Sequence, residues 1–256
     1  SSYIRQFGTG TQKVEESLKK TFEKCSVIRM DMDTTTYKNS HEDILTAFKE
    51  ENINVMVGTQ MIAKGHDFPN VTLVGVLAAD SLLNMGDFRA SERTFQLVTQ
   101  VAGRAGRGSI PGRVVIQTYN TEDFSIETAC KHDYTSFYNQ EIKLREKLNY
   151  PPFTNIAVII LSGVYDKSVF IKAKGVKEYI DELFSVYKEE AEILGPARAP
   201  ISKIKNKYRW RIVIKCMDMD KIINVLSEVS DKFYGKNYKS KNNIDLSIDV
   251  NPVNML

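Results

Sequence analysis

The chain has 256 residues, of which 42% are hydrophobic and 26% are charged. This ordinary globular composition excludes a disordered chain, and the length predicts two domains. The net charge of +3 excludes no class of partner. The longest apolar stretch, residues 71–79, is far shorter than the roughly 20 residues that cross a bilayer, so we predict no contact with a membrane. The first residue is Ser rather than Met, and we expect a piece of a longer protein.

The first half of the chain alternates helical and strand patterns. Val14, Leu18 and Phe22, spaced four apart, predict a helix over residues 11–24. The pattern continues with strands at 27–31, 55–58, 72–78 and 112–118 and helices at 41–50 and 90–101. Strands that alternate with helices at this spacing predict an α/β fold, with a parallel sheet covered by helices on both faces.

The second half predicts a different arrangement. Residues 124–148 are typical of one helix, which Pro151 and Pro152 end. Beyond them we predict strands at 156–161, 209–216 and 244–250, helices at 169–190 and 220–233, and a short extended segment at 193–197. This β-α-β-β-α-β order is the split βαβ (ferredoxin-like) pattern of a smaller α+β domain. We therefore predict a first domain over residues 1–123, a helical linker over 124–150 and a second domain over 151–256.

The three cysteines, Cys25, Cys130 and Cys216, lie far apart in the sequence and form no C-x-x-C pair. This spacing is unfavourable both for a disulfide scaffold and for a zinc site, so we predict no metal site in this chain. Reduced cysteines fit the cytoplasm best.

Two arginines stand three apart in the glycine-rich stretch at residues 100–108, directly after a predicted helix. The guanidinium groups of Arg104 and Arg107 are rigid forks of donors that suit phosphate oxygens. An arginine held on such a loop can neutralise charge on a γ-phosphate. The alternative is an ordinary surface loop.

Residues 58–69 follow a predicted buried strand, where α/β folds place their ligand loops. Thr59 and Gln60 can donate to a phosphate, and Asp67 can accept from a ribose hydroxyl. The alternative is a plain connecting loop. Asp31 and Asp33, at the end of an earlier strand, are interpreted as turn caps.

A block of basic residues without any acidic one covers residues 197–217. Such a block predicts a phosphate-contacting surface, and the alternative is a solvated strand face. The single tryptophan, Trp210, lies in this block and either stacks on an unpaired base or packs in the core. The basic residues are Arg198, Lys203, Lys205, Lys207, Arg209, Arg211 and Lys215.

Together and in this order, the two loop segments resemble motifs V and VI of superfamily 2 helicases. Within that superfamily, nearly the whole chain resembles the bacterial replication-restart helicases. Residues 29–35 resemble motif IV, residues 87–89 and 91–93 resemble part of the motif VI region, and residues 8–16 resemble the start of the second RecA-like lobe. Residues 151–153, 194–196, 209–210 and 249–252 resemble the C-terminal domain of that family.

The resemblance implies that residues 1–123 are a RecA-like second helicase lobe and that the C-terminal domain binds DNA and partners. It implies three groups of site residues. Those that face the ATP phosphates are Arg107, the arginine finger, with Arg104 and Gln100. Those that contact the nucleotide are Gly65, Gly103 and Asp67. Those that contact DNA are Thr59, Gln60 and Lys64, for which the interface between the lobes is the alternative. The basic block adds the further predicted DNA contacts Lys203, Lys205, Lys207, Arg209, Trp210 and Arg211.

The sequence has no Gly-x-x-x-x-Gly-Lys-Ser/Thr loop and no Asp-Glu-x-His box, which in this family belong to the first lobe. The resemblance therefore implies ATP and Mg²⁺ shared with an absent first lobe, zinc only in the full-length protein, and no ATPase activity of this chain alone. The implied activity is 3′-to-5′ unwinding at stalled forks in the bacterial cytoplasm. The implied partners are branched or single-stranded DNA, single-strand-binding protein and other primosome proteins. The alternatives are a non-catalytic DNA-binding and docking module, or lobe 2 of another superfamily 2 translocase.

Overall fold

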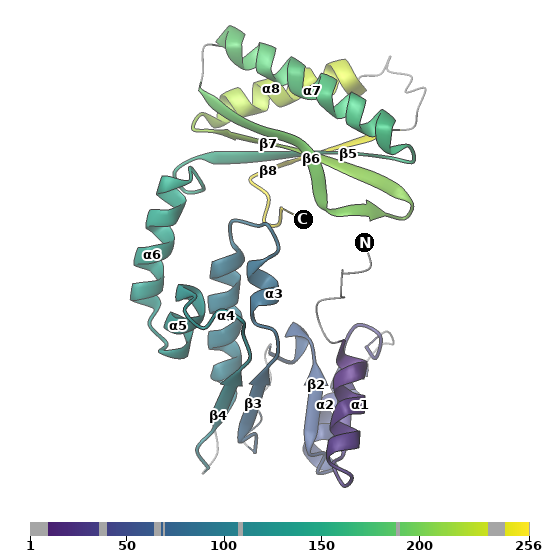
Figure 1. The fold of residues 1–256 in the computed structure, drawn as a ribbon, viewed down its shortest axis with the longest axis vertical. Coiled ribbons are helices and arrows are strands. Elements are labelled where there is room, and N and C mark those ends of the chain that lie inside the picture. The colour runs from purple at the N-terminus through teal and green to yellow at the C-terminus, as the bar shows by residue number, and fades with distance from the viewer. Residues whose placement is uncertain are drawn as a thin grey trace. The chain divides into compact units, whose positions relative to one another are not determined.

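The structure, a computed structural model, describes residues 10–35, 40–63, 68, 70–106, 110–187, 190–234 and 244–255. It divides into two compact units (Figure 1). Unit 1 consists of Ser1–Leu83 and Ser91–Phe137, and unit 2 consists of Asn84–Ala90 and Tyr138–Leu256. Within the described residues, every helix is too short or too polar to cross a membrane.

Unit 1 alternates helices with short strands, as the sequence predicts. Its strands pair in parallel, β1 (Val27–Met30) with β2 (Val55–Gly58) and β3 (Leu73–Val76) with β4 (Arg113–Ile116). No ladder joins these two pairs among the described residues, so the expected single sheet is present as two parallel pairs. The helical elements are α1 (Thr11–Thr21), α2 (Ser40–Glu50), the 3-10 turn η1 (Gln60–Ala63), α3 (Asp80–Leu83), α4 (Ala90–Ala102) and α5 (Phe124–Cys130).

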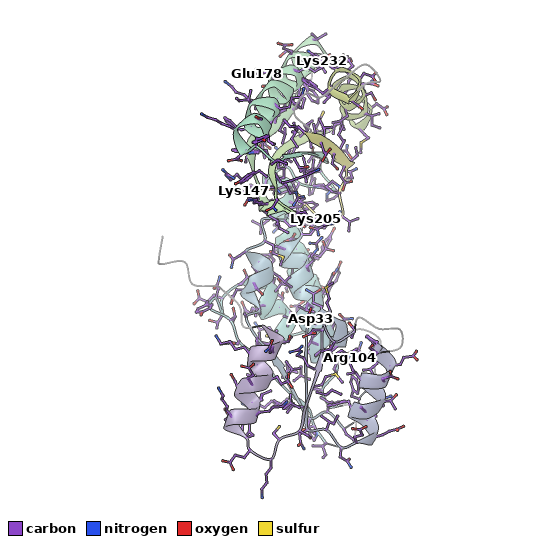
Figure 2. The ribbon with its side chains drawn as sticks, turned by 90° about the vertical axis from the view of Figure 1, so that its right-hand side faces the viewer. Asp33, Arg104, Lys147, Glu178, Lys205 and Lys232 are labelled. Atoms are coloured by element: carbon purple, nitrogen blue, oxygen red, sulfur yellow. The ribbon has the colours of Figure 1, made fainter. Side chains whose placement is uncertain are left out.

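Helices cover both faces of the β1–β2 pair. Both α1 and α2 contact β1, and Figure 2 shows them on opposite sides of the strands. A buried cluster near α2 contains Met30, Leu45 and Phe68. In α1, Val14 and Leu18 are half-buried, whereas the third residue of the predicted apolar stripe, at position 22, is 57% exposed just after the helix ends.

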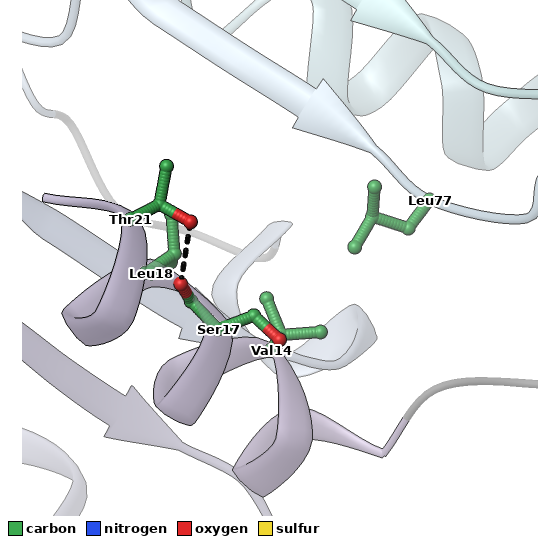
Figure 3. A pocket seen from close by; sticks show the side chains of 5 residues that line it. All are labelled: Val14, Ser17, Leu18, Thr21 and Leu77. Carbon is green, nitrogen blue, oxygen red and sulfur yellow. Dashed lines mark hydrogen bonds between the residues drawn. The ribbon is translucent and has the colours of Figure 1, made fainter.

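An open cavity of about 260 Å³ lies between α1 and the residue that follows β3 (Figure 3). Its lining is Val14, Ser17, Leu18 and Thr21 on one side and Leu77 on the other. The described lining carries no charged group, and we assign it no ligand.

The single helix predicted over residues 124–148 is wrong, because the structure breaks it into α5 and α6 (Tyr134–Lys147). His132 adopts a positive φ of 53° between the two helices. Asp133 then accepts a hydrogen bond from the backbone N–H of Ser136 at the start of α6. A capping carboxylate and one left-handed residue thus interrupt a continuous apolar pattern.

Unit 2 is a four-stranded antiparallel sheet with two helices. The strands lie in the order β6-β7-β5-β8, and α7 and α8 cover one face (Figure 1). The core under these helices includes Ile159, Val176, Ile212 and Val225, all fully buried. In chain order the elements are β5 (Asn155–Gly163), α7 (Asp166–Tyr187), β6 (Ala191–Ile204), β7 (Lys207–Cys216), α8 (Met219–Tyr234) and β8 (Asp245–Val250).

Strand β6 is much longer than the extended segment predicted at residues 193–197. It lies at the edge of the sheet and contains Pro196 and Pro200. An edge strand tolerates proline because one of its sides needs no ladder hydrogen bonds. The prolines therefore interrupt the strand pattern in the sequence, but they do not prevent the strand from forming.

The other face of the unit 2 sheet is covered by chain segments instead of helices. Ile156, Val158 and Val213 form a buried cluster there with Met255, and Phe88 packs against it. The loop before α4 is therefore built into the same unit as the C-terminal tail.

Candidate functional site

In unit 1, the chain just after the 58–69 segment is hydrogen-bonded to the loop after α4. The N–H of Gly106 donates to the carbonyl of Val71 at 3.1 Å, and the N–H of Val71 donates to the carbonyl of Phe68 at 3.1 Å. The chain that follows the 58–69 segment thus lies against the loop after α4. Two segments that are far apart in the sequence therefore meet at one place in the fold.

The loop after α4 closes through a tight crossing of two glycines. Gly106 has a φ of +74°, and a Cβ on it would lie 2.3 Å from the backbone nitrogen of Gly112. A Cβ on Gly112 would lie 2.2 Å from the nitrogen of Gly106. Only glycine fits at both positions, so the crossing sets where the loop leaves and rejoins the fold.

The 58–69 segment is anchored by one buried aromatic ring. Phe68 packs edge-on against Phe48 with the ring centroids 5.3 Å apart, in the cluster with Met30 and Leu45. The sequence pattern predicts Phe68 only as part of the segment, without this anchoring role. An aromatic residue directly after the polar run Lys-Gly-His-Asp at residues 64–67 is the signal that could have found it.

Helix α4 carries predicted phosphate-facing residues at its C-terminal end. Its Phe95 and Val98 are buried in a cluster with other residues of unit 1, which holds the helix firmly. In the last turn and just beyond it, Gln100 and Gly103 are exposed. Arg104, labelled in Figure 2, is half-buried.

The 58–69 segment leaves β2 beside the end of β1. A Cβ on Gly58 would lie 2.3 Å from the carbonyl oxygen of Met30, so the two strand ends touch. Thr59 and Gln60 follow directly and are exposed. Their polar groups are therefore available at the carboxyl end of a parallel strand, as the sequence predicts.

Part of the predicted site lies outside the described residues. The four site residues concerned are Lys64, Gly65, Asp67 and Arg107. Residues 8–9, quoted for the start of the lobe, also lie outside them. The geometry above therefore concerns the ends of the two segments and the helix that carries Arg104.

Asp31, at the end of β1, caps a turn, as the sequence predicts. Its buried carboxylate accepts hydrogen bonds from the backbone N–H groups of Asp33 and Thr34 and from the hydroxyl of Thr11. The hydroxyl of Thr11 contributes most to lowering the pKa of Asp31, against the opposing effect of burial, and the charge of Arg29 also lowers it. Asp31 therefore stays ionised and serves the fold.

Asp80 plays the same part after β3. Burial alone would raise the pKa of this carboxyl, but hydrogen bonds from the Thr118 hydroxyl and from the N–H groups of Tyr119 and Asn120 lower it overall. Across the described part of the chain, no three histidine, cysteine or acidic side chains are grouped so that they could hold a metal ion.

In unit 2, the β6–β7 hairpin presents lysines at its tip. Its two turn residues, Lys205 and Asn206, have φ values of 47° and 62°, as a tight two-residue hairpin turn requires. Lys203 Nζ lies 4.6 Å from the centre of the Tyr208 ring, and Lys207 Nζ pairs with a carboxylate of β8 at 2.5 Å. Figure 2 labels Lys205.

Three more basic residues of the 197–217 block have partners inside unit 2. Arg209 and Arg211 each donate to a backbone carbonyl. Lys215 is buried beside Glu192, at 3.0 Å. The three side chains share one face of β7, because residues two or four apart in a strand point the same way. The block therefore does not form one continuous free phosphate-facing surface, because these residues already contact other groups of unit 2.

Trp210 faces the helices of unit 2. Its indole Nε1 donates to Asp166 at 2.9 Å, its ring packs against Phe170 at 4.6 Å between centroids, and the guanidinium of Arg198 lies 5.2 Å from its centre. The hydrogen bond from Trp210 is the main reason that the pKa of Asp166 is lowered. Trp210 thus packs within unit 2, which is one of the two alternatives, and stacking on a base stays a prediction.

Comparison with known proteins finds matches for both halves of the chain. A helicase conserved C-terminal domain model matches residues 4–109, and a primosomal protein N C-terminal domain model matches residues 146–253. The replication restart protein PriA of Bacillus subtilis is 43% identical over 256 residues, which are 100% of this chain and 31% of the relative. The PriA of Synechocystis is 40% identical over 100% of this chain and 30% of the relative, and that of Chlamydia pneumoniae is 41% identical over 81% and 27%. The chain thus spans about a third of the length of the relatives it matches.

Proposed function

Because the chain matches the C-terminal part of the PriA replication restart proteins from end to end, we propose that it completes the ATP site and binds DNA in a replication-restart helicase. The observation that carries this proposal is the hydrogen bond from Gly106 to Val71. It brings the chain just after the 58–69 segment to the loop after α4, and the resemblance assigns these two segments to one nucleotide site.

At that site, Arg104 and Arg107 neutralise the ATP phosphates, with Arg107 as the arginine finger, and Gln100 links the nucleotide to the lobe. The residues that contact the nucleotide itself are Gly65, Gly103 and Asp67. ATP and Mg²⁺ are shared with a first lobe in the complete protein, so this chain alone does not hydrolyse ATP. A zinc site belongs to the complete protein as well.

DNA is the second ligand. In unit 1, Thr59, Gln60 and Lys64 contact the strand along which the helicase moves in the 3′-to-5′ direction. In unit 2, the exposed positions of Lys203 and Lys205 at the hairpin tip support a contact with phosphates, and the other proposed contacts are Lys207, Arg209, Trp210 and Arg211. We infer that the complete protein recognises stalled or branched forks in the bacterial cytoplasm and starts primosome assembly there, with single-strand-binding protein as a partner.

The proposal also includes a fold assignment for each unit. The parallel strands of unit 1 support a RecA-like second lobe over residues 1–123. In unit 2, the element order and the strand order β6-β7-β5-β8 support the split βαβ arrangement over residues 151–256, after a helical linker at 124–150.

ATP hydrolysis with and without a first lobe tests the catalytic half of this proposal. We expect no hydrolysis by the chain alone and DNA-stimulated hydrolysis by the complete protein. In the complete protein, Arg107→Ala should lose most of the turnover yet keep its affinity for DNA, because an arginine finger acts on the transition state. Arg113→Ala, which removes an exposed arginine on β4, is the matched control. Rapid hydrolysis by the chain alone, or full turnover by Arg107→Ala, would contradict the proposal.

A non-catalytic DNA-binding and docking module is the second candidate, favoured by the missing phosphate-binding loop in this sequence. The same assay separates the two functions. A docking module would bind DNA equally well and leave the ATPase rate of an added first lobe unchanged.

A further inference from the structure

We propose that Tyr165, with lysines of the β6–β7 hairpin, forms a stacking site for an unpaired DNA base at one end of unit 2. This inference rests on the DNA binding proposed above and specifies which residue and which form of DNA are involved. We call the surface the hairpin-end platform. It consists of Tyr165, Lys167, Lys203, Lys205 and Tyr208.

Tyr165 presents its ring from a fixed backbone. It stands between the end of β5 and the start of α7, and its carbonyl accepts hydrogen bonds from the N–H groups of Ser168 and Val169. Its side chain is nevertheless 69% exposed. An aromatic ring on an ordered backbone loses little conformational entropy when a base stacks on it.

The hairpin lies beside this tyrosine. Gly163, the last residue of β5, pairs with Tyr208 of β7, and Tyr208 pairs with Lys203 of β6. Tyr208 shares a sheet face with Trp210, two residues along the same strand, and Trp210 contacts Phe170 of α7. The Lys203–Tyr208 pair therefore lies on the face of the sheet from which α7 begins. Figure 1 shows the hairpin tip and the β5–α7 connection at the same end of unit 2.

The charge balance of the platform favours an anion. The nearby carboxylates are already held by other basic residues, Asp166 by Arg198 at 2.6 Å and Asp245 by Lys207 at 2.5 Å. Within the described residues, no acidic partner pairs with the three lysines of the platform. The platform thus keeps a surplus of positive charge at the end of unit 2 that also carries an exposed aromatic ring.

This combination matches single-stranded DNA. Lysines bind the phosphate backbone regardless of sequence, and aromatic rings stack on unpaired bases. A fully paired duplex offers the phosphates but keeps its bases stacked inside, so it can use the lysines and not the ring. Tyr165 therefore distinguishes unpaired from paired DNA.

Binding of the full 256-residue chain to fluorescent oligothymidylate and to a blunt duplex of the same length, followed by anisotropy, tests the platform. Tyr165→Ala should weaken single-strand binding by about fivefold or more, since loss of one stacked base has at least that effect. Its affinity for the blunt duplex should change less than about twofold, because phosphate contacts dominate there. Tyr165→Phe keeps the ring and should bind like the unmodified chain, and Tyr165→Leu, which keeps the apolar bulk without the ring, should behave like the alanine variant.

Matched controls come from elsewhere in the chain. Tyr119→Ala removes a tyrosine that is 85% exposed in unit 1 and should leave both affinities unchanged. Lys203→Gln with Lys205→Gln should reduce the slope of log affinity against log salt by about 1.4 for single strands, which corresponds to two phosphate contacts. Lys131→Gln with Lys174→Gln, two exposed lysines of other surfaces, should not change that slope.

The outcomes separate the two levels of the proposal. If the unmodified chain binds neither DNA at low salt, the proposed DNA binding itself fails. If it binds both, and Tyr165→Ala binds single strands like the unmodified chain or loses both forms of DNA equally, the platform is overturned while DNA binding stands.

Discussion

Single carboxylates hold the strand ends of unit 1 in place. The carboxylate of Asp31 accepts hydrogen bonds from Thr11, Asp33 and Thr34, and that of Asp80 accepts them from residues 118–120. Both groups are buried and ionised, with lowered pKa values. Each therefore stabilises the loop that follows its strand.

These shifts predict a loss of stability in acid. A carboxyl whose folded pKa is lowered contributes stability fully above its unfolded pKa, about 3.9, and loses it as the pH falls through the folded value. Unit 1 should therefore lose stability below about pH 5. Asp80→Asn should be less stable by about 1 kcal/mol at pH 7 and should lose less on acidification, as measured by urea unfolding at about pH 3 to 7. Glu51→Gln, an exposed control, should keep the original pH dependence, and an equally steep dependence in Asp80→Asn would rule out this role.

The close approach of Gly106 and Gly112 predicts that one added methyl group lowers the free energy of unfolding substantially. Gly106→Ala places a side chain at a φ of +74° and against the backbone of Gly112, so we expect a loss of about 1–2 kcal/mol or more. Gly75→Ala, whose Cβ would meet open space, should be neutral or slightly stabilising. Urea unfolding of the two variants compares them directly, and equal stabilities would show that the crossing is not tight.

Among the elements, α4 has an unusual start. The loop before it belongs to unit 2, where Phe88 stacks on Tyr150 with the ring centroids 5.2 Å apart. The guanidinium groups of Arg89 and Arg145 lie 4.8 and 5.3 Å from the centre of the Phe88 ring. Arg89 Nη1 also donates to the carbonyl of Pro252 at 2.9 Å. The loop that precedes α4 in the sequence is therefore held within unit 2 by aromatic stacking, cation–π contacts and a hydrogen bond.

Phe88→Ala should destabilise unit 2 by about 2 kcal/mol, because it removes a half-buried ring from the stack. Hydrogen exchange of the amides in β5 and β8 measures this loss. Phe22→Ala, which removes a ring that is 57% exposed in unit 1, should change stability by less than about 0.5 kcal/mol. Unchanged exchange rates of these amides in Phe88→Ala would mean that the loop contacts the sheet without stabilising unit 2.

At the scale of the whole molecule, the two units have cores of different size. The buried cluster under α7 and α8 is the largest described, whereas unit 1 holds two small clusters, around Phe95 and around Met30. Hydrophobic stabilisation grows with the apolar area removed from water. Unit 2 should therefore be the more stable one.

Urea unfolding should accordingly show two steps, with unit 1 unfolding first. Trp210 is the only tryptophan and lies in unit 2, so its fluorescence reports that unit alone. We expect the far-ultraviolet circular dichroism signal to begin falling at lower urea than the fluorescence changes. Coincident transitions would show that the units unfold together.

Much of the secondary structure could be predicted because its signals are local. The strand over Val55–Gly58 and the helix over Ala90–Ala102 follow from short apolar patterns that the fold preserves. The break between α5 and α6 at His132 could not be predicted, because the spacing of apolar residues does not change at a single residue with a left-handed backbone. The roles of Arg104 and Arg107 remain predictions, since no feature of the described structure tests them.

Most of the order of helices and strands, the two loop segments and the family they resemble follow from the sequence alone, because these depend on residues close together in the chain. Only the tertiary structure shows which candidate groups are exposed and which already contact other parts of the chain. It joins Gly106 to Val71, places Phe88 in unit 2, and puts Arg198 and Lys203 of β6 on the opposite face of the sheet from the basic residues of β7. The reason is physical: burial, pairing of charges and close approach of backbones depend on neighbours that are distant in the chain, and only folding brings them together.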